Sequence, residues 1–295
     1  MSKKNIVCFG EVLWDLLPSG KIAGGAPMNV AVHANQLGLN ATMISAVGND
    51  DLGEGIKSFL ESRGLNIENI QTTNDQKTGI VEVELNEQGS PSYTIIEPVA
   101  WDFIAITETA INVVKNSDAL VFGSLALRNE VSKNTLLELQ SLAKLSILDI
   151  NLRKPFYSET LVKELFELAD IVKVNDEELE MICAWYGQSG NEESNAKFLK
   201  ETFNLKGIIV TRGGNGAFFI DESNQMSEHK GFKISVNDTI GSGDSFLASF
   251  ITKWLNGFSP AKSLKFACAV GAFVATQKGA TPIINDVDIL NILEK

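Results

Sequence analysis

The stretch "DTIGSGDSFLASF", residues 238–250, places two glycines and two aspartates directly ahead of an apolar run. Gly241 and Gly243 permit backbone conformations and close approaches that a side chain would prevent. The amphipathic run that begins at Asp244 predicts a helix, whose first N–H groups have no partner within the helix and lie at the positive end of its dipole. A glycine-rich turn that leads into such a helix start favours an anion, and phosphate is the first candidate.

Asp244 itself admits two interpretations. In the simpler one it caps the helix, as aspartate often does after a turn. In the other it is a general base that accepts the proton of an attacking hydroxyl, while nearby backbone N–H groups stabilise charge on the transferred group. The cap explains neither the Gly-x-Gly sequence nor the second carboxylate at Asp238, but this stretch alone leaves both interpretations open.

Short apolar runs alternate with longer amphipathic segments along most of the chain. The runs that predict strands occupy residues 5–10, 41–48, 118–123, 145–150, 169–174 and 206–211. The segments that predict helices occupy residues 27–38, 51–63, 130–144, 159–168, 192–203, 244–256, 260–277 and 286–293. Apolar strands separated by helices indicate a mostly parallel sheet covered on both faces. With right-handed crossovers this gives an α/β fold, a three-layer α/β/α sandwich, and we expect residues 1–295 to form a single domain.

Two segments depart from this rhythm. Residues 78–97 alternate apolar and polar side chains on both sides of "NEQGS", which is typical of a hairpin, and residues 11–18 predict another strand. Together they predict a small β-sheet that stands off the main body and acts as a lid. The exposed edge of such a sheet also offers a second copy of the chain a strand to pair with, so the fold permits a homodimer through the lid.

Composition excludes several classes of partner. The chain has 295 residues, of which 44% are hydrophobic, and a formal net charge of −12, which disfavours nucleic acid and anionic membrane surfaces. Cys8, Cys183 and Cys268 stand far apart, so neither a metal cluster nor a disulfide framework is expected. No apolar run approaches the roughly 18 residues of a membrane span, and we expect a soluble, cytoplasmic protein.

Other motifs fit the chain less well. "GEGIKS" at 53–58 approaches a Walker A loop but lacks the glycine before its lysine, and no GxGxxG follows a strand. "GDSF" at 243–246 is similar to a serine-hydrolase motif with Ser245 as the nucleophile, but that mechanism needs a histidine base. We expect His33 to lie within a helix and His229 at the surface, which makes the hydrolase a weak alternative.

Five stretches resemble motifs of the PfkB family of sugar kinases, which have the ribokinase-like fold, and especially its fructokinase-like members. They are "GGAPMNVAVHANQLG" (24–38), "DINLR" (149–153), "KVNDEEL" (173–179), "VTRGGNGA" (210–217) and "DTIGSGDSFLASF" (238–250), in the family's order and approximate spacing. The resemblance covers essentially the whole chain. It implies an ATP- and Mg²⁺-dependent kinase that phosphorylates a hydroxymethyl oxygen of a small-molecule sugar, with fructose the first candidate. The alternatives are 2-keto-3-deoxygluconate, a nucleoside or another hexose as substrate, and a non-catalytic sugar-binding protein on the same scaffold.

The resemblance also implies roles for individual residues. Asp244 matches the family's catalytic base, and the N–H groups of Gly241, Ser242, Gly243 and Asp244 match its anion hole. Asp15, Gly24, Gly25 and Asn29 match sugar-binding positions. Asn175 and Glu178 match the element that organises Mg²⁺ through water, Thr211 and Gly213 match positions that flank the ATP phosphates, and Arg153 is a candidate phosphate contact.

Simpler interpretations of these residues remain open. Asn175 and Glu178 also fit an ordinary helix start with an acidic first turn, and Arg153 also fits a surface ion pair. Asp15 also fits a carboxylate at a strand edge, and Asn29 a solvated residue in the first helical turn. Trp14, Tyr93 and Trp101 are candidates either for covering the sugar ring or for the core.

Departures from the family's pattern narrow the substrate. Ribokinases carry an asparagine where Leu13 stands and a glutamate near Ser124 and Leu125, so ribose is disfavoured. Many relatives bind a monovalent cation through the position of Asp238 and carbonyls near 278–283. A serine ligand of some of them is Ile283 here, which weakens the case for K⁺ without removing it.

Overall fold

A computed structural model describes residues 3–17, 20–85 and 91–294 and confirms the α/β sandwich. Its strands are β1 (Asn5–Phe9), β2 (Leu13–Leu17), β3 (Gly20–Gly24), β4 (Asn40–Gly48), β5 (Ile70–Thr73), β6 (Gly79–Leu85), β7 (Pro91–Ile95), β8 (Ala119–Gly123), β9 (Ser146–Asp149), β10 (Ile171–Asn175), β11 (Gly207–Thr211), β12 (Ala217–Ile220) and β13 (Met226–His229). Its helices are α1 (Ala26–Gln36), α2 (Asp51–Ser62), α3 (Glu108–Asn116), α4 (Glu130–Gln140), α5 (Glu159–Leu168), α6 (Asp176–Trp185), α7 (Glu192–Thr202), α8 (Ser242–Leu255), α9 (Pro260–Ala275) and α10 (Asp286–Leu293).

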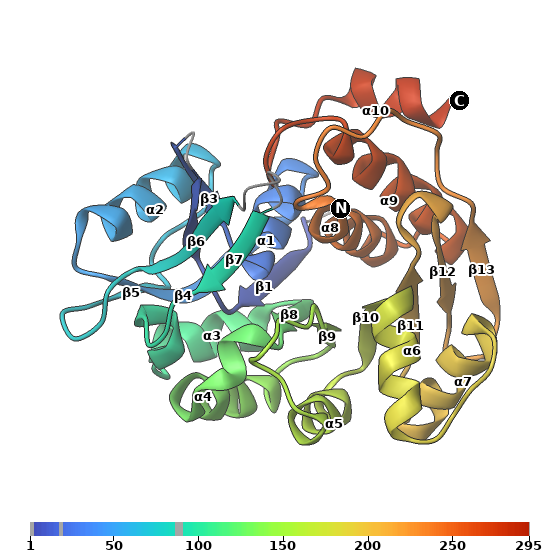
Figure 1. The fold of residues 1–295 in the computed structure, drawn as a ribbon, viewed down its shortest axis with the longest axis horizontal. Coiled ribbons are helices and arrows are strands. Elements are labelled where there is room, and N and C mark those ends of the chain that lie inside the picture. The colour runs from blue at the N-terminus through green and yellow to red at the C-terminus, as the bar shows by residue number, and fades with distance from the viewer. Residues whose placement is uncertain (1–2, 18–19, 86–90, 295) are drawn as a thin grey trace.

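The main sheet has the strand order β13-β12-β11-β10-β9-β8-β1-β4-β5 (Figure 1). Neighbours from β11 to β5 are parallel, and the hairpin of β12 and β13 adds an antiparallel edge. From β1 the chain moves through β4 and β5 to one side, and it then returns to build the other side from β8 onward. The order therefore reverses between β1 and β8, and ligands of open α/β sheets bind outside the carboxyl ends of the strands at such a point.

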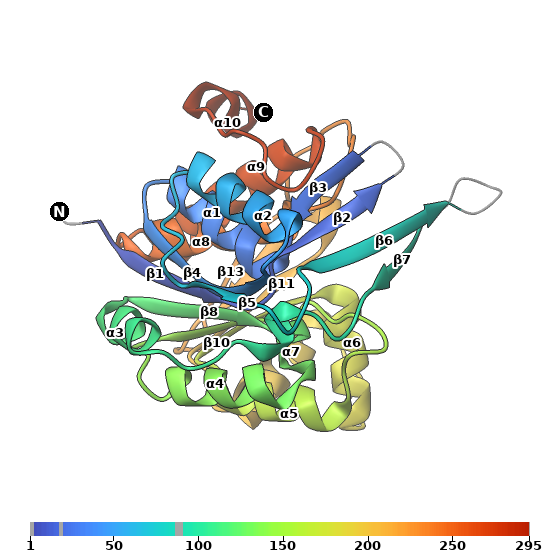
Figure 2. The same ribbon diagram turned by 90° about the vertical axis from the view of Figure 1, so that its left-hand side faces the viewer.

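Two hydrophobic cores lie on opposite faces of this sheet. Within β1, Ile6 and Cys8 belong to one core, and Val7 and Phe9 belong to the other, because successive side chains of a strand point to opposite faces. Helices α1, α2, α8 and α9 cover the first core, and α3 to α7 cover the second. Figure 2 shows α1, α2, α8 and α9 above the sheet and α3, α4 and α5 below it. No helix in the described part of the chain combines the length and apolar character needed to span a membrane.

All six predicted strands and all eight predicted helices of the main body are present. The short strands β5, β12 and β13 and the helix α3 were not among the predicted elements, and α6 was anticipated only as a possible helix start at Asn175 and Glu178. Helix α8 begins at Ser242 rather than Asp244, with Gly241 as its N-cap at φ 74°, a conformation that favours glycine. Asp244 is thus the third residue of the helix, and the interpretation of Asp244 as its cap is wrong.

The small sheet has the strand order β3-β2-β6-β7, and Figure 2 shows it projecting away from the main body. Strands β2 and β6 come from the expected segments 11–18 and 78–97 and pair in parallel, while β3, which ends at Gly24, was not anticipated. Two parts of those segments, residue 18 and the expected turn at 86–90, lie outside the described residues.

A buried ion pair fixes the point where the small sheet returns to the body. Arg128 donates from Nε to Asp102 Oδ1 (2.7 Å) and from Nη2 to both Asp102 Oδ2 (2.9 Å) and the carbonyl of Ile96 (2.8 Å), just after β7. Its guanidinium lies 4.1 Å from the ring centroid of Trp101. The side chains of Arg128 and Asp102 are 5% and 2% exposed, so solvent screens the pair very little.

We predict that Arg128→Met lowers the free energy of unfolding by about 3–5 kcal/mol, because it leaves the buried Asp102 carboxylate without its cation. Urea denaturation measures the loss. The double variant that adds Asp102→Asn removes the buried charge as well and should recover part of it. A single variant as stable as the wild type would show that the ion pair does not anchor the small sheet.

Candidate active site

A cavity of ≈ 580 Å³ lies at the carboxyl ends of the central parallel strands, beneath the small sheet. Its polar wall includes Glu11 after β1, Ser124 after β8, Asn151 after β9 and Asn175 at the end of β10. Strands of the small sheet add apolar side chains: Leu13, Val81 and Ile95. The start of α8, including Asp244, closes the cavity from another side. The cavity therefore lies where the strand order reverses, as expected for a ligand site in this fold.

A second cavity of ≈ 440 Å³ adjoins the first on the other side of the α8 start. Its wall combines glycines of the β11–β13 region with apolar side chains such as Phe232, Ile234 and Val236. Four residues line both cavities: Asn175, Thr211, Thr239 and Gly243. A ligand in one cavity can therefore meet a ligand in the other across Gly243, one residue from the Asp244 carboxylate.

Asp244 is held by a neighbouring helix. Asn29, in the first turns of α1, donates from Nδ2 to Asp244 Oδ2 at 2.8 Å. The pKa of Asp244 is raised to about 6, chiefly by burial and also by the charge of Asp149, against the opposing effects of Asn29, Lys173 and Arg153. Asn29 is 4% exposed, so the solvated alternative for it is wrong. A carboxylate with this pKa is ionised at neutral pH yet accepts a proton more readily than ordinary aspartate.

The four N–H groups that were expected to form an anion hole are not all free. The N–H of Ser242 donates to the carbonyl of Thr239 at 3.2 Å, so it is not free. Within the described residues, the N–H groups of Gly241 and Gly243 have no acceptor. The expected set of four donors is therefore corrected by the loss of Ser242, whose hydroxyl also donates elsewhere, to the carbonyl of Gly271 at 3.0 Å.

A buried ion pair that was not anticipated from the sequence lies beside Gly243. Lys173 Nζ donates to Asp149 Oδ1 at 2.7 Å, and the two residues are direct partners of the neighbouring strands β10 and β9. A Cβ added to Gly243 would lie 3.5 Å from Lys173 Nζ, so the ammonium borders the shared wall of the two cavities. A lysine within the apolar run "ADIVKV" was the available signal, since a buried charge needs a partner.

The glycine pair at the end of β3 allows two carboxylate-bearing segments to pack closely. A Cβ on Gly24 would lie 2.8 Å from Asp15 Oδ2, and a Cβ on Gly25, at φ 120°, would collide with the carbonyl oxygen of Glu11. Asp15, Gly24, Gly25 and Asn29 all line the ≈ 580 Å³ cavity, so the structure brings the four predicted sugar-binding residues together. Burial raises the pKa of Asp15 to about 6, against the opposing charge of Arg153.

Asn175 and Glu178 form a reciprocal cap at the start of α6. Asn175 Oδ1 accepts the N–H of Glu178 (2.7 Å), and Glu178 Oε2 accepts the N–H of Asn175 (2.9 Å). Glu178 Oε1 accepts the N–H of Leu152 (2.9 Å). The simpler interpretation as a helix start is thus confirmed, while Asn175 lines both cavities and Glu178 is buried behind it. Burial raises the pKa of Glu178, and Lys173 opposes the shift.

The remaining predicted residues lie in different places: some line one cavity, some line both, and Asp238 lines neither. Thr211 lines both cavities, and Gly213 lines the ≈ 440 Å³ cavity. Arg153 lines the ≈ 580 Å³ cavity with Asp244, and no carboxylate pairs with it among the described residues. Asp238 lines neither cavity; its carboxylate accepts N–H groups from Ile240 (3.0 Å) and Gly279 (3.2 Å) and so joins two loops.

The predicted aromatic cover of the cavity is not formed by tryptophan. Trp14 is 8% exposed and donates from Nε1 to the carbonyl of Leu52 at 2.9 Å, and Trp101 is fully buried. Neither lines the ≈ 580 Å³ cavity, so both belong to the core. The side chain of Tyr93 lies outside the described part of the chain.

The positions of the residues exclude the Walker A loop and the serine hydrolase. Residues 53–58 lie inside α2, where no phosphate-binding loop can form. Ser245 is fully buried and donates to the carbonyl of Ser242 at 2.9 Å, so it is not an accessible nucleophile. His33 is also fully buried, with Nε2 bonded to the carbonyl of Ala280 at 2.9 Å, and burial lowers its pKa to about 4.

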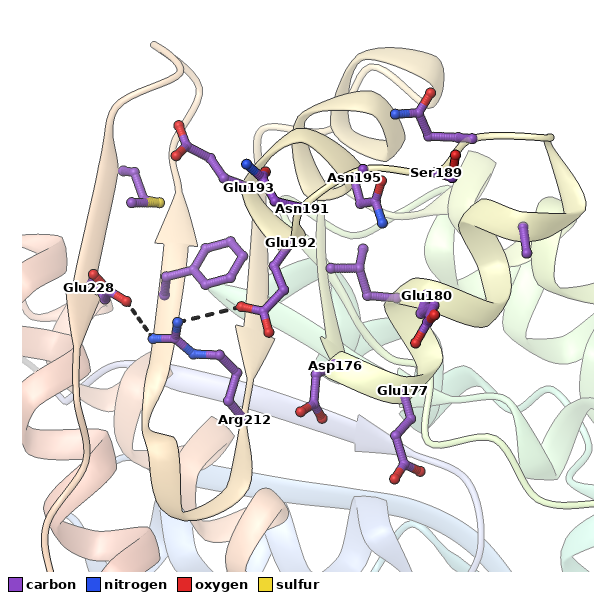
Figure 3. Close-up of a pocket in the computed structure, with 16 residues that line it drawn as sticks. Asp176, Glu177, Glu180, Ser189, Asn191, Glu192, Glu193, Asn195, Arg212 and Glu228 are labelled. Carbon is purple, nitrogen blue, oxygen red and sulfur yellow. Dashed lines mark hydrogen bonds and ion pairs between the residues drawn. The ribbon is translucent and has the colours of Figure 1, made fainter.

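A third cavity, of ≈ 790 Å³, lies away from these residues. It lies between α6, α7 and the β11–β13 region and has an acidic wall (Figure 3). Its one arginine, Arg212, is held by Glu228 at 2.7 Å and Glu192 at 3.4 Å, as Figure 3 shows. Asp244, Lys173 and the α8 start do not line it.

The chain is similar to known proteins over nearly its whole length. Residues 4–286 match the pfkB family carbohydrate kinase. Fructokinase-2 of Solanum lycopersicum is 28% identical over 308 residues, which cover 95% of this chain and 92% of that protein. An uncharacterized sugar kinase from Pyrococcus horikoshii, in complex with ATP, has a TM-score of 0.77 and 28% identity over 94% of this chain and 95% of its own. A fructokinase double mutant from Vibrio cholerae O395, bound to fructose, ADP and potassium ion, shares the fold with a TM-score of 0.84, 24% identity and 99% coverage of both chains.

We predict that Asp244→Asn stabilises the fold at neutral and higher pH. The folded protein raises the pKa of this carboxyl from 3.8 to about 6, so ionised Asp244 disfavours folding above that pH, and the cost disappears as the pH falls below the lower value. The variant should therefore melt at a higher temperature than the wild type at about pH 8, with a difference that shrinks as the pH falls through 6 towards 4. Thermal melts across this range provide the measurement. An equal difference at all pH values would contradict the assigned pKa.

Proposed function

The chain belongs to the pfkB family of carbohydrate kinases, and we propose that it transfers the γ-phosphoryl group of ATP to a hydroxymethyl oxygen of fructose. One observation carries this proposal: the free N–H of Gly243 stands on the wall shared by two cavities of different character, and Asp244, the next residue, lines the ≈ 580 Å³ cavity. Relatives support the choice of ligands. The protein from Solanum lycopersicum is named a fructokinase, and the structure from Vibrio cholerae holds fructose and ADP.

The ≈ 580 Å³ cavity suits the sugar. Asp15 and Asn29 offer oxygen acceptors to hydroxyl groups, and Arg153 offers donors. Asn29 occupies one oxygen of Asp244 and leaves Oδ1 as the acceptor for the hydroxymethyl proton. Removing that proton raises the nucleophilicity of the attacking oxygen as it meets the phosphoryl group.

The ≈ 440 Å³ cavity suits the nucleotide. Phe232, Ile234 and Val236 provide an apolar surface for a purine ring, and the glycine-rich turn at residues 213–216 leaves room for phosphates close to the backbone. A triphosphate that runs from this surface to Gly243 ends beside Asp244. The free N–H groups there, at the positive end of α8, and the ammonium of Lys173 then stabilise the charge that develops during transfer.

Residues at or behind the shared wall of the two cavities fit Mg²⁺ bound through water. Asn175 and Glu178 supply amide and carboxylate oxygens, and Asp149 Oδ2 is a buried acceptor with no partner in the described part of the chain. Such hard oxygen donors suit Mg²⁺, which keeps much of its own hydration. When bound, Mg²⁺ supplies positive charge to the phosphate oxygens.

The small sheet acts as a lid in this proposal. Leu13, Val81 and Ile95 present apolar side chains to the cavity from three of its strands. Closing this surface over a bound sugar excludes water and limits hydrolysis of ATP. A monovalent cation near Asp238 and a homodimer through the edge of the lid stay predictions of the sequence.

We predict that the wild type phosphorylates fructose in an ATP- and Mg²⁺-dependent assay. The panel contains fructose, other hexoses, 2-keto-3-deoxygluconate and nucleosides, and product formation is followed for each. Asp244→Asn should lower turnover roughly 10²–10⁴-fold, because it keeps the side-chain shape but removes the base. Preference for another compound on the panel would disprove fructose as substrate, and near-normal turnover by the variant would remove Asp244 from its role.

We predict that Gly243→Ala folds normally but loses turnover, on the order of 10²-fold, because its methyl group displaces the phosphoryl group from the shared wall. The new Cβ meets Lys173 Nζ at 3.5 Å, an ordinary contact, so the melting temperature should not fall. Gly241→Ala is the matched contrast, since its Cβ would collide with the backbone of Ala280 at a positive φ and should destabilise the protein. Unchanged nucleotide KM and turnover in Gly243→Ala would contradict the anion hole.

A further inference from the structure

Arg212 connects three elements at the edge of the main sheet. It lies between the end of β11 and the glycine turn at residues 213–216. Its Nη2 donates to Glu228 Oε1 at 2.7 Å, and its Nη1 donates to Glu192 Oε2 at 3.4 Å, as Figure 3 shows. Glu228 belongs to β13, and Glu192 belongs to the first turn of α7. One guanidinium therefore joins the end of β11 to a second strand and to a helix.

The glycine turn is held mainly at its two ends. The N–H of Arg212 donates to the carbonyl of Gly216 at 2.8 Å, and the carbonyl of Arg212 accepts the N–H of Asn215 at 2.9 Å. A Cβ on Gly213 or on Gly214 would meet nothing within 4 Å, so space is open on that side of the turn. Because three glycines of this turn line the ≈ 440 Å³ cavity, the position of Arg212 determines where part of the cavity wall lies.

Glu228 leads to another part of the same wall. Strand β13 ends at His229, one residue after Glu228, and four residues within 231–236 line the ≈ 440 Å³ cavity. A Cβ on Gly216 would collide with the carbonyl oxygen of His229, so the glycine turn packs directly against the chain that leaves β13. The ion pair of Arg212 and Glu228 therefore joins two segments that line one cavity, although Arg212 itself does not line it.

These ion pairs are suited to holding a local segment in place. The side chain of Arg212 is 17% exposed, while those of Glu192 and Glu228 are 43% and 41% exposed. Ion pairs with such exposed partners add little to the free energy of global unfolding. They can still fix a loop, since local openings cost less than global unfolding. The planar guanidinium meets two carboxylates while it lies 5.4 Å from the ring centroid of Phe218, and a lysine ammonium has no such fork.

We propose that Arg212 is a positioning residue for the nucleotide: its ion pairs with Glu228 and Glu192 hold the glycine turn against the segment that follows β13. The two segments then form a fixed wall for the phosphates of ATP. Arg212 is assigned no contact with the nucleotide and no part in the transfer step. This inference rests on the proposed function, because it requires the nucleotide to occupy the ≈ 440 Å³ cavity.

Arg212→Met tests the proposal, because methionine keeps an apolar side chain near Phe218 but removes the guanidinium. The KM for ATP should rise about 3- to 10-fold, the change expected for the loss of one or two partly exposed ion pairs. The kcat and the KM for fructose should stay unchanged, since the ≈ 580 Å³ cavity and Asp244 are not altered. Arg212→Lys keeps a cation for Glu228 and should recover part of the affinity for ATP.

Lys206→Met is the matched control. Lys206 precedes β11 at the opposite end of the strand and pairs with Asp170 at 2.8 Å, with its side chain 50% exposed. Neither residue of this pair lines the ≈ 440 Å³ cavity. The control variant thus removes an ion pair beside the same strand without changing the nucleotide side, and its KM for ATP should equal that of the wild type.

Glu228→Gln separates positioning from simple attraction of ATP by the charge of Arg212. Removal of the carboxylate makes the local potential more positive, so simple attraction predicts a lower KM for ATP. Positioning predicts a higher KM, because the guanidinium loses its charged partner at 2.7 Å. The double variant Arg212→Met, Glu228→Gln should have a KM no higher than that of Arg212→Met alone, since both changes break the same contact.

Calorimetric titration with ADP and Mg²⁺, without sugar, measures nucleotide binding independently of activity. Arg212→Met should bind ADP more weakly than the wild type, and the Lys206→Met control should bind it equally well. If Arg212→Met melts below the assay temperature, Arg212→Lys and Glu228→Gln replace it in both the kinetic and the calorimetric measurements.

The outcomes distinguish this inference from the proposed function. A wild type that binds no ADP would overturn both. If the wild type binds ADP but phosphorylates a sugar other than fructose, only the choice of fructose fails, and the kinetics are measured with that sugar. If the wild type binds ADP but Arg212→Met binds it equally well, or Glu228→Gln lowers the KM for ATP, the role of Arg212 is wrong and the proposed function stands.

Discussion

The hydrogen bond between Asn29 and Asp244 is the contact around which the site is assembled. It joins residues 215 positions apart in the sequence and brings the start of α1 to the start of α8. Each helix carries groups that the other helix lacks. In the proposed mechanism, the first turn of α8 supplies free N–H groups for the phosphoryl group, and α1 supplies Asn29 on the side of the sugar. Only when the two helices pack on the same face of the sheet do the proposed base and the proposed anion site lie next to each other.

The acidic character of the site has to be reconciled with an anionic co-substrate. The whole chain carries a formal charge of −12, and Glu11, Asp15 and Asp244 line the sugar cavity. Local positive groups oppose the negative electrostatic potential of these charges: the free N–H groups at the start of α8, Lys173 and Arg153. Because the interior screens charge weakly, a few fixed donors next to a phosphate outweigh distant surface carboxylates.

The same features that suit the chemistry work against stability. Burial raises the pKa values of Glu11 to about 7 and of Asp15 and Asp244 to about 6, which means that the folded protein holds these charges at a cost near neutral pH. Two buried acceptors, Glu11 Oε2 and Asn29 Oδ1, have no partner in the described residues.

The sequence by itself determined the alternation of strands and helices, the α/β class and the glycine turn ahead of α8, because these depend on local period and on backbone freedom. It also identified Asp15, Asn29 and Asp244 as candidate site residues. The tertiary structure alone decided that Lys173 meets Asp149, since their pairing depends on β9 and β10 being neighbours in register. It likewise decided that the N–H of Ser242 donates to the carbonyl of Thr239. It also decided that the N–H of Ala26 donates to the side chain of Glu11, although β2 and β3 lie between these two residues in the sequence. Such contacts depend on how segments that are distant in the sequence pack together, and no local sequence pattern encodes this packing.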